Sequence, residues 1–288
     1  MKLGFVIYTY NRINDAKINM EIIRTIWSKE SDLSDIKIVH SYNGKKEWYK
    51  GKYLEDILLR STNPGHFQGA ADLIDRGFVE ITKKYPDLDY IVILASDCWL
   101  TDPKKVLPVL NKMKSGGFKV ATSVWGEEGS KLKDKGMATD FFILDARWAI
   151  RYKLLPLNYK EFSDKNRDVL WYMGVVLMVE KLALLRFTEA VYREEPSINK
   201  LKKNILEKLC LITERDPIYS EQDKYGGWCL KHYYPEIGLL TRHNPYEKRE
   251  DVKKLDFKMD APTFNHFISS EDLSDYVSGE VQKPSKAL

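Results

Sequence analysis

Cysteine is scarce in this chain of 288 residues, and the spacing of the few cysteines does not match a structural motif. Cys98, Cys210 and Cys229 lie far apart and are odd in number, so they predict neither a disulfide framework nor a metal site. We therefore expect a reducing compartment. A signal-peptide pattern is also missing, and the most apolar stretch, 170–179, is too short to span a bilayer. These absences predict a cytoplasmic protein without a transmembrane segment, and they leave peripheral contact with a membrane open.

A strong charge of one sign is absent as well. The chain has 46 basic and 42 acidic residues, a net charge of +4, and no basic run with interleaved aromatic residues, which argues against nucleic acid as a partner. The GxxxxGK[ST] phosphate loop, the GxGxxG fingerprint, the HExxH zinc motif and the GxSxG elbow do not occur. What is present is a globular composition, 43% hydrophobic and 12% aromatic. It predicts one large domain, or one domain with a sizeable insertion.

The stretch YIVILA at 90–95 is almost entirely apolar and predicts a central strand that is buried on both faces. Ser96 and Asp97 follow it, and Asp102 with Pro103 then predicts the start of a helix. Ligands of open α/β sheets bind where strands end and helices begin. Asp97 is therefore a candidate to hold a metal–phosphate pair, although a plain turn explains the same residues.

Polar residues also follow three earlier strands, which are predicted at 2–10, 36–40 and 58–60. The first strand leads into a helix that reaches about residue 28, and the third leads through 63–69 into a helix at 70–84. This β-α-β order favours a parallel sheet, whose strand ends share one edge. The candidate ligand-binding residues at that edge are Thr9, Tyr10, Asn11, Arg12, Asn43, Asn63, Gly65, Gln68, Gly69, Ser96 and Asp97. Two alternatives stay open: tight helix packing for 63–69, and an ion pair with a helix acid for Arg12.

The second half of the chain has a different character. Strands are predicted at 119–123, 140–144 and 238–242, a helix is predicted from 146, and a surface loop is predicted at 126–135. The segment 156–216 is rich in Leu, Lys and Glu and predicts a helical insertion with helices at 167–185, 187–192 and 197–211. The fold class is therefore α/β, a mostly parallel open sheet flanked by helices, Rossmann-like, with a helical insertion in the C-terminal half.

Six short motifs, in this order, resemble the GT-A-fold glycosyltransferases, most closely the inverting family-two enzymes. They are TYNR at 9–12, NPGHFQGAADLIDRG at 63–77, YIVILASDCWLTDPKKVLPVL at 90–110, DFFILDARWA at 140–149, EQD at 221–223 and LLTRH at 239–243. The resemblance covers residues 2–244 without the helices of 156–216. It implies a GT-A-like domain at 1–245, with a nucleotide-binding half at 1–125, an acceptor half at 126–245, and a C-terminal extension at 246–288.

The resemblance implies transfer of a sugar from a nucleoside-diphosphate sugar, with UDP favoured, to a glycan, lipid-linked or small-molecule hydroxyl acceptor. Asp97 and His243 would hold Mn²⁺ or Mg²⁺ near the diphosphate. Inversion requires a carboxylate that takes the proton of the attacking hydroxyl, and Asp223 is the first choice for this base, with Glu221 second. A solvated loop explains both acids equally well, and a plain strand-end histidine explains His243.

This chain departs from the family pattern in two places. The metal motif has Ala95 or Ser96 where its first acid would stand, and the acidic motif reads Glu-Gln-Asp rather than Glu-Asp. The second departure leaves retention open beside inversion. The first motivates an alternative function, a non-catalytic nucleotide-sugar binding protein. A nucleotidyltransferase is disfavoured, because its glycine-rich basic loop is replaced here by TYNRIND at 9–15.

Overall fold

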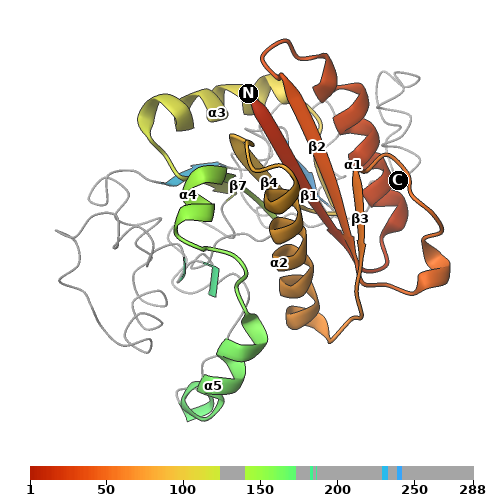
Figure 1. Cartoon of the computed structure of the whole chain (residues 1–288), viewed down its shortest axis with the longest axis vertical. Coiled ribbons are helices and arrows are strands. Elements are labelled where there is room, and N and C mark those ends of the chain that lie inside the picture. The colour runs from red at the N-terminus through yellow and green to blue at the C-terminus, as the bar shows by residue number, and fades with distance from the viewer. Residues whose placement is uncertain (124–139, 173–181, 184–185, 187–228, 233–238, 242–288) are drawn as a thin grey trace, which may run out of the picture.

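The computed structural model describes residues 1–123, 140–172, 182–183, 186, 229–232 and 239–241, which form a mixed α/β fold (Figure 1). A seven-stranded sheet has the order β3-β2-β1-β4-β7-β6-β8, and β5 pairs with β9 separately. The strands are β1 (Lys2–Thr9), β2 (Asp35–Tyr42), β3 (Ile57–Arg60), β4 (Tyr90–Ala95), β5 (Cys98–Leu100), β6 (Val120–Ser123), β7 (Phe141–Asp145), β8 (Cys229–His232) and β9 (Leu239–Thr241). The α-helices are α1 (Ile13–Thr25), α2 (His66–Lys84), α3 (Pro103–Gly116), α4 (Ala146–Arg151) and α5 (Tyr159–Tyr172).

The sheet is mostly parallel, as the sequence predicts. Strands β3, β2, β1 and β4 are neighbours and run in the same direction, and β6 and β8 run parallel to each other. Among the described strands of this sheet, β7 alone is antiparallel to both of its neighbours. The register pairs Thr9 with Tyr42, Tyr8 with Ala95, and Tyr42 with Arg60. The carboxyl ends of these four strands therefore meet at one edge.

Helices cover both faces of the sheet because the side chains of each strand alternate between two cores. In β1, Leu3, Phe5 and Ile7 pack with the apolar residues of α1 and α3, whereas Val6 packs with those of α2 and α4. Figure 1 shows α1 and α2 on either side of the strands. A side-chain carbon at Gly77 of α2 would overlap Val6, so glycine allows α2 to lie directly against β1.

The structure confirms the strands predicted for the first half, β4 with its predicted bounds, and the side-chain cap of α3, where Asp102 accepts a hydrogen bond from the backbone of Lys104. Two helices begin earlier than predicted: α2 begins at His66, and α5 at Tyr159 rather than at 167. Strands β5 and β8 were not predicted. The predicted helices 187–192 and 197–211, the loop 126–135 and the extension 246–288 lie outside the described residues.

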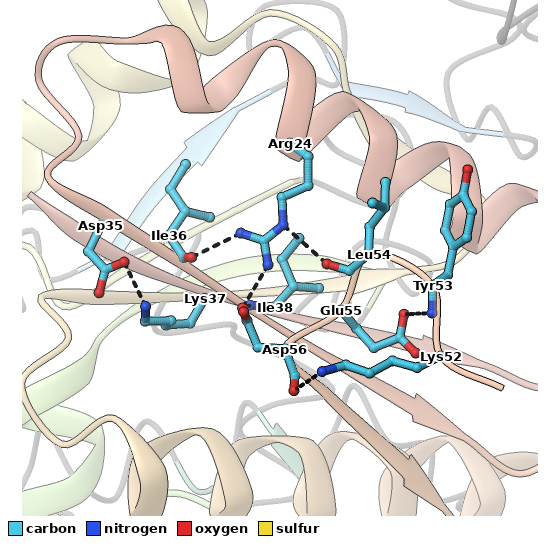
Figure 2. A network of polar contacts seen from close by, with 10 residues as sticks. All are labelled: Arg24, Asp35, Ile36, Lys37, Ile38, Lys52, Tyr53, Leu54, Glu55 and Asp56. Carbon is cyan, nitrogen blue, oxygen red and sulfur yellow. Dashed lines mark hydrogen bonds and ion pairs between the residues drawn. The ribbon is translucent and has the colours of Figure 1, made fainter.

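A network centred on Arg24 fixes the segment between β2 and β3 (Figure 2). The Arg24 guanidinium, which comes from α1, donates to the carbonyls of Leu54 at 3.1 Å and Ile36 at 3.2 Å, and forms an ion pair with Asp56 at 2.8 Å. The same Asp56 carboxylate accepts the backbone N–H of Ile38 at 2.7 Å. One side chain therefore joins α1, β2 and the end of the 43–56 segment.

Candidate functional site at the carboxyl edge of the sheet

Backbone hydrogen bonds hold three of the predicted strand ends together. The N–H of Asn43, just after β2, donates to the carbonyl of Thr9 at 3.2 Å, and the N–H of Ser96, just after β4, donates to the carbonyl of Tyr8 at 3.1 Å. The buried amide of Asn19, from α1, donates to the carbonyl of Ser96 at 2.9 Å. Asn19 is a supporting residue that sequence reasoning missed, because a lone asparagine on the buried face of a helix has no pattern.

Arg12 and Asp97 form an ion pair at this edge. Nη1 of Arg12 lies 3.1 Å from Oδ2 of Asp97, and the exposed fractions of the two side chains are 34% and 16%. The sequence left two partners open for Arg12, a ligand diphosphate and an acid on a helix. The structure shows an acid, but this acid follows a strand rather than lying on a helix. The pair places one cation and one anion beside the ends of β1 and β4.

Asn43, Asn63 and Gly69 form a second polar group where α2 begins. The Asn43 amide donates to the carbonyl of Gly69 at 3.2 Å, and Oδ1 of Asn63 accepts the N–H of Gly65 at 3.0 Å. Oδ1 of Asn43 is buried without a hydrogen-bond partner. A Cβ at Gly69 would displace the end of the Asn63 side chain, and Gly65 has a φ of +122°, a backbone conformation that favours glycine. This group brings together four of the predicted residues and leaves an acceptor unsatisfied.

An exposed aromatic pair borders the same edge. Tyr10 and Trp48 are 45% and 42% exposed, and their ring centroids are 5.9 Å apart in an edge-on arrangement. Nζ of Lys45 lies 5.1 Å from the centroid of Trp48. Sequence reasoning named Tyr10 but missed Trp48, whose one signal is a large aromatic residue within a lysine-rich loop. Flat exposed rings beside a cation suit a planar or sugar-bearing ligand.

Thr9 is placed differently from the other predicted residues. Its side chain is buried, and Oγ1 lies 3.1 Å from Nε2 of the buried His40. Burial, and then the positive charge of Arg60, lower the pKa of His40 to about 3, so its imidazole is neutral at physiological pH. The hydroxyl of Thr9 therefore supports the interior of the edge, and its backbone carbonyl holds Asn43.

Gln68 lines a pocket of about 480 Å³ between α2 and the start of α5. Asp75 also lines the pocket and is buried, and its carboxylate accepts the backbone N–H groups of Leu157 at 2.6 Å and Asn158 at 3.1 Å. These bonds join residues 82 and 83 positions apart and satisfy backbone donors just before α5. Local sequence signals do not indicate this contact. The contact fixes the backbone just before Tyr159, where α5 begins earlier than predicted. The other lining residues are Ala71, Asp72, Asn158, Tyr159, Lys160, Glu161 and Asp164.

Burial raises the pKa of Asp75 to about 7, against the opposing effect of its two backbone hydrogen bonds; Asp72 raises it further and Arg186 lowers it. The native chain therefore keeps, between pH 4 and 7, a proton that the unfolded chain releases, so this group costs stability as pH rises through that window. Asparagine does not titrate, so we expect Asp75→Asn to lack this decrease in stability with rising pH. The difference in unfolding free energy, variant minus wild type, should therefore increase by roughly 2–4 kcal/mol between pH 4 and pH 8. Urea denaturation at a series of pH values measures this difference, and two parallel stability curves would contradict it.

The described residues do not fit a divalent metal. No group of three or more His, Cys, Asp or Glu side chains among them is arranged to hold one, and the Asp97 carboxylate already faces a guanidinium. His243, Glu221 and Asp223 lie outside the described residues, so the metal and the base stay predictions. Thr241, two positions before His243 in the sequence, pairs with Cys98 next to Asp97.

The fold and this edge together define an α/β protein with a polar, partly exposed site at the ends of parallel strands. Neither a protein-family model nor a curated protein matches the chain. A solved glycosyltransferase involved in the glycosylation of the major capsid of PBCV-1 is similar over 97% of this chain and 100% of its own, at 10% identity and a TM-score of 0.39. A197 from STIV is similar over 52% of this chain and 68% of its own, at 14% identity and a TM-score of 0.31. Likeness at this level assigns neither a family nor an activity.

In the described part of the chain, every helix is too short or too polar to cross a bilayer.

Proposed function

We propose that this chain is a glycosyltransferase, which moves a sugar from a nucleoside-diphosphate sugar, with UDP favoured, to a hydroxyl acceptor. The supporting observation is the gathering of predicted residues at the carboxyl edge. There Asn43 is bonded to Thr9 and Gly69, and Arg12 is paired with Asp97. Ligands of open α/β sheets bind outside that edge. The acceptor, a glycan, a lipid-linked molecule or a small molecule, belongs to the half of the chain at 126–245.

The nucleoside end of the donor is assigned to the aromatic pair and Asn43. Tyr10 and Trp48 offer exposed rings on which a nucleobase can stack. The unpartnered Oδ1 of Asn43 is an acceptor for the imide N–H of uracil or for a ribose hydroxyl, and such a donor would remove the cost of leaving it unsatisfied. A uracil nucleotide supplies both a ring and donors.

The diphosphate of the donor is assigned to the region between Arg12 and the start of α2. Gly65, which precedes the first residue of α2, has no side chain to cap the helix, and N–H groups at the start of a helix attract anions. The reaction needs stabilisation of the charge that develops on the leaving diphosphate. It also needs a base for the acceptor hydroxyl, for which Asp223 is proposed, with Glu221 as the second choice. Inversion is the favoured outcome.

Thermal denaturation of the full chain with nucleoside diphosphates tests the binding half of this proposal. We expect UDP at about 100 times its Kd to raise the Tm by roughly 4–8 °C, because a ligand specific for the folded state adds about 2.7 kcal/mol of stability. The double variant Tyr10→Ala, Trp48→Ala should lose most of that shift. Tyr53→Ala is the matched control, since Tyr53 is similarly exposed but contacts Glu21 rather than this aromatic pair. If UDP, GDP, CDP and ADP all leave the Tm unchanged, the proposal is wrong.

A nucleotide-sugar binding protein without turnover is the second candidate. The pairing of Asp97 with Arg12 favours this candidate, because the carboxylate predicted to bind the metal already faces a fixed positive charge. Both candidates predict the UDP-dependent rise in Tm. They differ in whether donor is consumed.

A further inference from the structure

At the carboxyl edge, the cation is more accessible than the acid. Arg12 directly precedes α1, and its side chain is 34% exposed, whereas Asp97 lies two residues beyond the end of β4 and its side chain is 16% exposed. The two side chains meet at 3.1 Å. Asn19 fixes the backbone next to Asp97 through the carbonyl of Ser96. The backbone next to the acid is therefore fixed by the buried Asn19, and the arginine side chain that the acid contacts is the more exposed of the two.

This arrangement favours an anion over a second cation. Mg²⁺ and Mn²⁺ prefer several oxygen ligands. In the part of the chain that the structure describes, the Asp97 carboxylate lies beside a fixed positive charge, and the nearby Asp140 carboxylate accepts a hydrogen bond from Cys98. A dication at Asp97 would meet electrostatic repulsion from Arg12. A guanidinium, in contrast, has five N–H donors in a planar fork that matches both carboxylate and phosphate oxygens. Contact with one carboxylate oxygen leaves it able to donate to a phosphate.

We infer that Arg12, oriented by Asp97, neutralises the leaving diphosphate in this chain, and that nucleotide binding needs no divalent metal. The inference rests on the proposed function, because its ligand is the diphosphate of the donor. In the transfer step, the bond between the anomeric carbon and the β-phosphate oxygen breaks and its electron pair stays on that oxygen. The acceptor oxygen bonds to the anomeric carbon and its proton passes to a carboxylate base. Arg12 donates hydrogen bonds to the phosphate as its charge increases, and Asp97 acts as a positioning residue.

Isothermal titration of the full chain with UDP, in EDTA and then in Mn²⁺, tests the inference. We expect the wild type to bind UDP in EDTA with a Kd within about threefold of that in Mn²⁺. Arg12→Gln should weaken UDP binding by about tenfold or more in both buffers, and Arg12→Lys should recover part of the loss. The Kd of the wild type should also rise more steeply with added NaCl than that of Arg12→Gln, which a purely structural role would not produce.

Asp97→Asn gives the sharpest contrast. If Asp97 orients Arg12, removal of its charge leaves the cation without its fixed partner, so UDP should bind several-fold more weakly than to wild type, by the same factor in EDTA and in Mn²⁺. If Asp97 is a metal ligand, the same change should abolish binding that depends on Mn²⁺. Circular dichroism of each variant establishes that it is folded.

Three results would overturn the inference. UDP binding that requires Mn²⁺ and disappears in Asp97→Asn would restore the metal and leave the proposed function intact. Wild-type affinity in a folded Arg12→Gln variant would remove Arg12 from the diphosphate site. Absence of UDP binding in both buffers would reject the proposed function itself, and with it the role of Arg12.

Discussion

Asp223→Asn is expected to reduce consumption of a UDP-sugar by about 10²- to 10⁴-fold, the usual contribution of a positioned general base. The asparagine amide has nearly the shape of the carboxylate but cannot take the proton of the attacking hydroxyl. Affinity for UDP should stay within about threefold of wild type, because this role is confined to the reacting end of the donor. Release of UDP from a panel of UDP-sugars, with and without added acceptors, measures the rate.

Glu221→Gln is the matched control for this experiment, since it makes the same chemical change two positions away. A larger loss in Glu221→Gln than in Asp223→Asn would exchange the two assignments. Unchanged turnover in both variants would remove the EQD segment from the chemistry. If the wild type binds UDP but consumes no donor, the chain is the nucleotide-sugar binding protein that the second candidate describes.

Local patterns in the sequence were sufficient to predict the longer strands and the helices of the first half, but not the short strand β5. Buried runs such as Tyr90–Ala95 are bounded by turn residues, and Asp102 with Pro103 has the composition of a helix start. These signals act within a few residues of one another, so a single sequence contains them. The parallel direction of β1 to β4 follows from the β-α-β order, and it brings the predicted strand ends to one edge.

Contacts between distant segments were not predictable in the same way. Nothing near Arg12 in the sequence indicates that its partner is Asp97, and nothing near Asp75 indicates that it holds the N–H of Leu157. Strand β8 contains Lys231 and His232 and lacks a continuous apolar run, so its pairing with β6 depends on the sheet rather than on local propensity. The exposure of Trp48 likewise depends on how its loop is held.

Arg24 holds the end of that loop at Leu54 and Asp56, and Arg24→Ala is expected to lower the free energy of unfolding by about 2–4 kcal/mol. The change leaves the carbonyls of Ile36 and Leu54 and the carboxylate of Asp56 without their shared donor (Figure 2). All of these groups are partly buried, so water replaces the guanidinium incompletely. Urea denaturation measures the loss.

Arg76→Ala is the control for Arg24→Ala, because Arg76 forms one exposed ion pair, with Asp72 on its own helix, and its removal should cost about 0.5 kcal/mol or less. Arg24→Lys should be intermediate, since an ammonium group retains the charge but cannot span three acceptors on separate segments. Equal losses in Arg24→Ala and Arg76→Ala would contradict the role of the network.

If that role is correct, Arg24→Lys should also weaken UDP binding while remaining folded, because Arg24 bonds to the segment that carries Trp48 but lies outside the candidate site. A stability loss without any change in UDP affinity would mean that the network supports the fold and leaves the position of Trp48 to other contacts.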